Sequence, residues 1–94
     1  MNSSEVALIC RALSDANRLQ IVELLTRGEQ CTCELQEHFH ITQPTLTHHM
    51  TMLSECGLLK SRKEGRKTFY ELNCINLTEF RKFIAGLECK KIDD

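Results

Sequence analysis

The fold of this chain is decided by the stretch TQPTLTHHM at residues 42–50 and by CTCELQEHF at residues 31–39 just before it. Thr42 is a favourable N-cap, Pro44 fits the first turn of a helix, and Gly57 is suited to ending one. The apolar face of this helix has helical spacing and comprises Leu46, Met50 and Leu53. The preceding stretch predicts a shorter helix, so the two together predict a helix-turn-helix.

Two further helices are expected before this motif. The first begins at Ser3 or Ser4. The second begins at Ser14 or Asp15 and ends before Gly28, because these residue types favour the two ends of a helix. Apolar residues recur at helical spacing in both, at Val6, Ile9, Cys10, Leu13, Leu19, Ile21, Val22, Leu24 and Leu25. Both helices therefore present an apolar face to a core.

The chain after Gly57 predicts a hairpin and a last helix. Residues 58–63 and 67–72 have the composition of strands, and the segment between them contains Gly65. A capping-box pattern starts the last helix at Asn76. Its apolar positions are Phe80, Phe83, Ile84 and Leu87. The expected fold is mainly α (α+β), a winged helix-turn-helix with about five helices and a two-stranded β-hairpin wing.

Composition limits the architecture to a single domain. The chain has 94 residues, of which 41% are hydrophobic and 27% charged, so residues 1–94 are expected to form one small domain. No signal peptide and no apolar run of membrane-spanning length is visible, so a cytoplasmic location away from the membrane is expected. In that reducing compartment the six cysteines serve as metal ligands, redox sensors or small buried hydrophobes more often than as disulfides.

Basic residues are concentrated in the predicted hairpin. The net charge of the chain is −1, yet five of the twelve Lys and Arg residues lie between Lys60 and Lys67, with Glu64 as the one acid. Such a run by itself is as often a solvated face as a binding surface. Next to a helix-turn-helix it indicates contact with a polyanion.

The order of these elements and several local motifs resemble the ArsR/SmtB family of bacterial metal-responsive repressors. The residues that carry the resemblance are 13–19, 42–50, Leu53, 56–59 and 62–72. The resemblance covers nearly the whole chain. It implies a homodimeric transcriptional repressor, not an enzyme, that binds double-stranded operator DNA and releases it when a metal ion binds.

Within that family the helix after the turn resembles the one that enters the major groove. Its outer residues suit base and phosphate contacts, and they are Gln43, Pro44, Thr45, Thr47, His48 and Thr51. His49 is expected to pack against the core. The wing residues expected to reach phosphates or the minor groove are Arg62, Lys63, Arg66 and Lys67.

Cys31 and Cys33 resemble the Cys-x-Cys metal site of arsenic- and cadmium-type members. A helix N-terminus favours the thiolate form of cysteine, and thiolates bind soft ions. As(III) or Sb(III) is therefore the favoured regulatory ligand, and Cd(II), Pb(II) and Zn(II) are alternatives. No obligatory cofactor is expected. Side chains two residues apart on a helix point about 200° apart. For both sulfurs to bind one ion, the first turn must therefore unwind or Cys31 must lie outside the helix. Some members have a third cysteine where this chain has Gln36. Cys10, of either subunit, or a small exogenous thiol is a candidate third ligand.

The remaining cysteines and the apolar terminal helices have simpler expected roles. Cys10, Cys56, Cys74 and Cys89 are interpreted first as small buried hydrophobes. The residues expected at a dimer interface are Val6, Ile9, Phe80, Phe83, Ile84 and Leu87.

Three other functions remain as alternatives. A thiol-based redox-sensing regulator would use the same scaffold and the same cysteine pair. A small thiol-redox enzyme is disfavoured because no thioredoxin-like pattern is present. A module that binds only protein is disfavoured by the basic wing.

Overall fold

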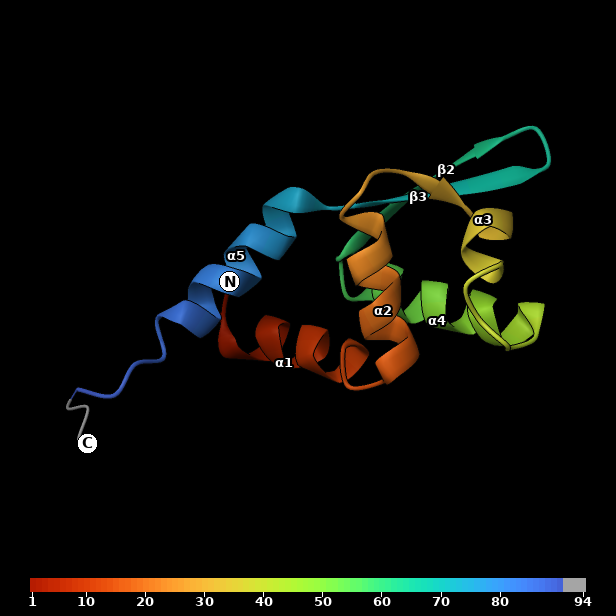
Figure 1. The fold of residues 1–94 in the computed structure, drawn as a ribbon. Helices are drawn as coiled ribbons and strands as arrows, with labels where there is room; N and C mark the ends of the chain where they lie inside the picture. The colour runs from red at the N-terminus through yellow and green to blue at the C-terminus, as the bar shows by residue number, and fades with distance from the viewer. Residues whose placement is uncertain (91–94) are drawn as a thin grey trace.

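The computed structural model describes residues 1–90, in which five helices and three strands follow one another along the chain (Figure 1). The elements are α1 Ser3–Ala12, α2 Ala16–Leu25, β1 Gln30–Cys31, α3 Thr32–Gln36, α4 Gln43–Glu55, β2 Leu59–Glu64, β3 Lys67–Leu72 and α5 Cys74–Ala85. Helices α3 and α4 form the helix-turn-helix, and β2 and β3 form the wing. The mainly helical winged helix-turn-helix fold expected from the sequence is confirmed.

The helices begin where side chains satisfy the free amide groups of the first turn. The Asp15 carboxylate accepts hydrogen bonds from the amides of Asn17 and Arg18, at 2.8 and 3.2 Å, and so caps α2. The last helix begins earlier than the sequence pattern predicted, because Asn73 caps it by accepting from the Asn76 amide at 3.1 Å. Asn76 is therefore inside the first turn of α5.

The sheet has a third strand that the sequence analysis did not predict. The strand order is β1-β3-β2, and all pairs are antiparallel. Strand β1 is only two residues long, too short to show an alternating pattern, and its Cys31 lies opposite Phe69 of the wing. The wing turns at Gly65, whose φ of +62° suits the first position of a two-residue hairpin turn.

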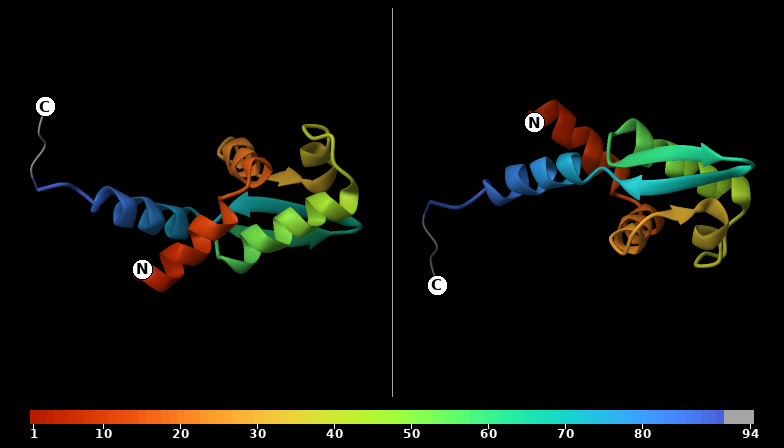
Figure 2. Two further views of the ribbon diagram at one scale, coloured as in Figure 1. Left: turned by 90° about the horizontal axis from the view of Figure 1, so that it is seen from below. Right: turned by 90° about the horizontal axis from the view of Figure 1, so that it is seen from above.

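The core lies between the helices and the base of the wing. Its fully buried large side chains are Ile9, Ile21, Leu35, Leu46, Met50, Leu53 and Leu58. Helices α1 and α5 lie at one end of the molecule, whereas α3 and the start of α4 lie toward the wing tip at the other end (Figures 1 and 2). None of the helices in residues 1–90 is long and apolar enough to cross a membrane.

Val6 and Ile9, which were predicted to lie at a dimer interface, are covered by their own chain. These side chains are only 5% and 1% exposed within the single chain, because α1 packs on α4 and α5. The sequence pattern marked the correct face of α1 as apolar but did not show that its own chain covers it. Helix α5 differs, because Ile84 and Leu87 are exposed and Phe80 and Phe83 are half-buried.

Candidate functional site

Helix α4 presents a polar face to solvent along its whole length. The side chains on this face are exposed, and they are Gln43, Pro44, Thr45, Thr47, His48 and Thr51. The Thr51 hydroxyl donates to the Thr47 carbonyl at 3.0 Å, and the hydroxyls of Thr42 and Thr45 lie 2.9 Å apart. These local bonds hold Thr45 at the start of the helix and Thr51 in its middle.

A buried polar contact holds α4 to α2. His49 of α4 is 6% exposed, as expected from the sequence, and its Nδ1 lies 3.0 Å from Nη1 of Arg18, which is 9% exposed. Arg18 also donates from Nε to the Ala12 carbonyl at 2.6 Å. Because a guanidinium cannot accept a hydrogen bond, His49 Nδ1 must be the acceptor, and its imidazole is neutral with the proton on Nε2.

The surroundings of this contact shift the pKa values of His49 and of the nearby Asp15. Burial lowers the pKa of His49 below 6.5, mainly by removing water from the charged form. The pKa of Asp15 is also lowered, chiefly because its carboxylate accepts from the Arg18 amide. Neutral His49 is therefore the form that the fold selects.

The wing carries two kinds of basic residue. Lys63, Arg66 and Lys67 are exposed near its tip. Arg62 does not belong with them, because its guanidinium bonds both oxygens of Glu29 at 2.7 and 3.0 Å.

Arg62 differs from the other basic residues of the wing because its guanidinium is paired with two carboxylates. Its guanidinium also bonds Glu64 and lies 4.5 Å from the centre of the Phe69 ring. The hydrogen bonds that its guanidinium donates to Glu29, and then to Glu64, raise the pKa of Arg62, so its charge is permanent but paired locally. Arg62 anchors the wing to the loop before β1.

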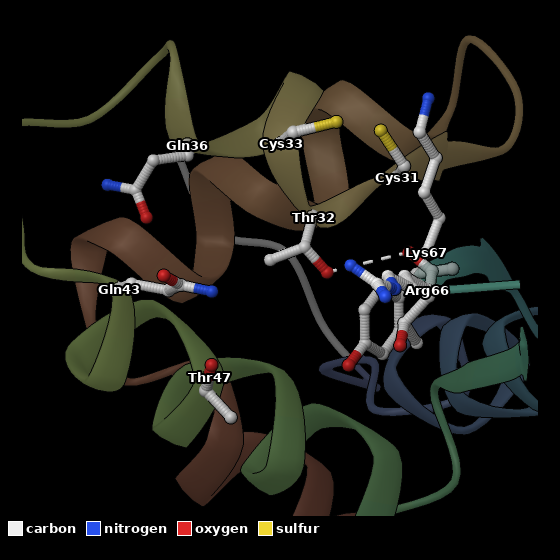
Figure 3. Close-up of a pocket in the computed structure, with 10 residues that line it drawn as sticks. Cys31, Thr32, Cys33, Gln36, Gln43, Thr47, Arg66 and Lys67 are labelled. Carbon is white, nitrogen blue, oxygen red and sulfur yellow. Dashed lines mark hydrogen bonds between the residues drawn. The ribbon is translucent and has the colours of Figure 1, made fainter.

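Cys31 lies outside helix α3, at its N-cap, and Cys33 is in the first turn. The Cys31 amide donates to the Glu34 carboxylate at 2.9 Å, completing the capping box predicted from the sequence. Figure 3 shows the two sulfur atoms pointing toward one another. Both can therefore reach one ion without unwinding the helix, which is the second of the two arrangements considered above.

The neighbouring thiol acts against the stabilisation of a Cys31 thiolate expected from the helix N-terminus. A hydrogen bond to the Cys33 thiol raises the pKa of Cys31, although the Glu34 amide acts in the opposite direction. Cys31 is 3% exposed, whereas Cys33 is exposed. A soft ion must therefore displace the thiol proton, so we expect binding to release protons.

The cysteine pair opens into a pocket shared with α4 and the wing. The pocket has a volume of about 470 Å³ (Figure 3). Its lining residues are Cys31, Thr32, Cys33, Gln36, Gln43, Thr47, Arg66, Lys67, Thr68 and Tyr70. Four predicted DNA-contacting residues and both predicted ligands therefore border one space.

Cys10 is not part of this pocket. It is exposed on α1, and the residues that line the pocket do not include it. In residues 1–90 no three Cys, His, Asp or Glu side chains are grouped to hold a metal ion. The prediction that the cysteines outside the Cys31–Cys33 pair are buried was mostly wrong. Cys10, Cys74 and Cys89 are exposed, and Cys56 is half-buried.

Sequence reasoning missed Arg18, Thr68 and Tyr70. Arg18 had a detectable signal, because it shares the helical spacing of Ile21, Val22 and Leu25 and so stands on the apolar face of α2. A basic residue there requires buried acceptors. Thr68 and Tyr70 had no signal, because they border the pocket only through the pairing of β3 with β1.

Comparison with known proteins shows the family to which the chain belongs. Residues 15–61 match the profile described as bacterial regulatory protein, arsR family. An arsenical resistance operon repressor of Staphylococcus aureus is 48% identical over 73 residues, which are 78% of this chain and 70% of that protein.

Two solved structures have the same fold. A possible transcriptional regulator for arsenical resistance superposes with a TM-score of 0.75 and 32% identity, covering 81% of this chain and 79% of that one. A homodimeric winged helix-turn-helix DNA-binding domain from Mycobacterium bovis, a possible ArsR-family regulator, has a TM-score of 0.71 and 26% identity and covers 88% of this chain and 80% of its own.

The family match and the repressor relatives define a DNA-binding transcriptional regulator, not an enzyme. The chain belongs to the ArsR family of bacterial regulatory proteins.

Proposed function

We propose that this protein is a homodimeric cytoplasmic repressor that releases its operator when a thiophilic metal(loid), with As(III) or Sb(III) favoured, binds Cys31 and Cys33. The observation that carries the proposal is the shared pocket. Its wall contains both sulfurs together with Gln43 and Thr47 of α4 and basic residues of the wing. A ligand on the sulfurs therefore lies against the surface proposed to contact DNA.

The donor atoms of the pocket fit a soft, thiol-seeking ion. Two sulfurs face each other, and no Asp or Glu side chain lines the pocket among the described residues. Hard cations such as Mg²⁺ prefer oxygen ligands, whereas thiolates select soft ions. Cd(II), Pb(II) and Zn(II) remain candidates on the same donor chemistry. The arsenical resistance repressor with 48% identity supports As(III) as the first ion to test.

Strand β1 gives a second route from the sulfurs to the wing. Cys31 is at once the cap of α3 and the β1 residue opposite Phe69, and Thr32 Oγ1 lies 3.4 Å from the Thr68 carbonyl. A change at the cap is therefore transmitted to β3 by direct contact. A coupling of roughly 1–3 kcal/mol between ligand and DNA lowers operator affinity about 5–150-fold.

The first prediction separates the two kinds of wing residue. Arg66→Gln should reduce the slope of log affinity against log salt by about one, because one phosphate contact is lost. Arg62→Gln should leave that slope near the parent value, because Glu29 and Glu64 already neutralise its charge. Fluorescence anisotropy over a series of salt concentrations measures both slopes. Equal reductions would place Arg62 on the DNA after all.

The second prediction concerns base reading. Gln43→Ala should weaken binding to the operator by about 1–3 kcal/mol and leave binding to random duplex nearly unchanged, because Gln is suited to pair with adenine. Thr26→Ala is the control, because Thr26 is exposed at the end of α2, outside the predicted contact set, and its hydroxyl is already bonded to the Glu23 carbonyl. An equal loss on both duplexes would show that Gln43 contacts phosphate only.

The third prediction concerns the dimer, which a two-fold operator requires. Ile84 and Leu87 are 42% and 69% exposed on and just after α5, and we propose that they pack against a second copy. Sedimentation at micromolar concentration should give a dimer, and Ile84→Glu should shift it toward monomer. A parent that stays monomeric at all concentrations would contradict the proposed assembly.

An electrophoretic mobility shift tests the proposed function as a whole. The chain should retard operator DNA, and arsenite or cadmium should release it while magnesium should not. The facing sulfurs also favour a second candidate, a redox sensor that forms a Cys31–Cys33 disulfide. Release by diamide alone, with no response to any metal(loid), would favour that alternative.

A further inference from the structure

The pocket offers As(III) two sulfurs, whereas As(III) bonds to three thiolates. Cys31 and Cys33 supply two, and no third Cys, His, Asp or Glu joins them within residues 1–90. The space beside the sulfurs is nevertheless large. A volume of about 470 Å³ lies within the range of pockets that bind small organic molecules and far exceeds the needs of one ion.

The charges around the pocket favour an anionic ligand. Arg66 and Lys67 line it from the wing tip, and the described lining residues include no carboxylate to pair with them. Arginine and lysine bind carboxylates through charge-assisted hydrogen bonds. A ligand that carries a carboxylate therefore fits the wing side of the pocket.

We propose that the pocket binds a low-molecular-weight amino-acid thiol, such as cysteine or a cysteinyl peptide, as the third sulfur ligand of As(III). This inference rests on the proposed function of Cys31 and Cys33. The thiol supplies the missing sulfur, and its carboxylate contacts Arg66 and Lys67, which line the same pocket.

The reaction is a ligand exchange without oxidation or reduction. Three As–O bonds of As(OH)₃ break and three As–S bonds form, to Cys31, Cys33 and the small thiol. The three S–H protons combine with the three released hydroxides to give three water molecules. No further reactant is required.

The bound thiol explains release of DNA by occlusion. It occupies Arg66 and Lys67, which are proposed to contact phosphate, and it fills the space in front of Gln43 and Thr47. DNA and the arsenic–thiol adduct therefore compete for the same side chains. The first turn of α3 does not have to unwind.

The experiment uses the purified full chain, reduced with a phosphine so that no thiol is carried over. The protein is titrated with arsenite by isothermal calorimetry in three conditions: without added thiol, with mercaptoethanol and with cysteine. The mass of each adduct is then measured by native mass spectrometry. We expect about tenfold tighter arsenite binding with cysteine than with mercaptoethanol, because only cysteine has the carboxylate. The adduct should contain one cysteine per arsenic.

Variants test the contacts separately from the arsenic site. The double variant Arg66→Gln, Lys67→Gln should lower arsenite affinity with cysteine to the mercaptoethanol level. Lys60→Gln is the control, because Lys60 is an exposed basic residue outside the pocket, and it should retain the tenfold preference.

Three outcomes would overturn the inference, and they differ from failure of the proposed function. Arsenite bound equally tightly without added thiol would mean that the protein supplies all three ligands. Equal affinity with mercaptoethanol and cysteine, or an unchanged preference in the double variant, would exclude the carboxylate contact. Absence of arsenite binding in every arm would instead refute the arsenic site itself.

Discussion

Replacing Cys33 with Ser is expected to abolish release of operator DNA by arsenite while leaving operator affinity within about twofold of the parent. Cys33 is exposed in the first turn of α3, so the substitution removes a soft ligand without opening a cavity. The entire coupling between ligand and DNA, about 5–150-fold in affinity, should disappear. Anisotropy of labelled operator with and without arsenite measures the loss.

Cys31→Ser is the companion change with a different side effect. Its hydroxyl is a better helix cap than a thiol, so α3 should be as stable as in the parent or slightly more stable, although arsenite release is again lost. Cys89→Ser, in the exposed segment after α5, should respond normally. Normal release in Cys31→Ser, at the parent's arsenite concentration, would exclude the Cys-x-Cys pair as the inducer site.

The sequence was sufficient to predict elements whose signals are local. Thr42 and Pro44 begin α4 because capping and φ preference act within one turn, and helix α4 runs from the residue after Thr42. The cysteine pair was found because its spacing is visible in the chain. The fold followed from the order of such elements together with a family resemblance.

What the sequence could not predict depends on contacts between distant segments. Glu29 and Arg62 are 33 positions apart, so nothing local indicates that one neutralises the other. Val6 and Ile9 were correctly marked as apolar, but whether a helix of the same chain or a second copy covers an apolar face is decided by packing. Strand β1 exists only because β3 pairs with it.

The contact between Arg18 and His49 also joins residues that are distant in the sequence, 31 positions apart. Removing it should strongly reduce the stability of the fold. Arg18→Met should lower the free energy of unfolding by roughly 2–6 kcal/mol, because it leaves the Ala12 carbonyl and His49 Nδ1 without donors at about 1–3 kcal/mol each. That is a large share of a typical stability of about 5–15 kcal/mol. Arg11→Met, at an exposed residue in the last turn of α1, is the control. Urea denaturation measures both.

The lowered pKa of His49 makes the stability of the fold depend on pH, so that stability falls as the pH falls. Because burial lowers the pKa of His49 below 6.5, the folded chain binds fewer protons at this site than the unfolded chain does. The resulting stability is complete above about pH 6.5 and is lost as the pH falls toward the folded-state pKa. Protonated Nδ1 would also face the Arg18 guanidinium as a like charge.

His49→Asn isolates this titration. The Asn side-chain oxygen can accept from Arg18 as Nδ1 does, but it cannot gain a proton, so the variant should lose less stability than the parent between pH 7 and pH 5. Urea denaturation at a series of pH values compares the two slopes. Parallel slopes would show that His49 does not control acid stability. A shallower slope in His49→Asn, with Arg18→Met strongly destabilised at pH 7, would establish that neutral His49 is the acceptor that ties α4 to α2.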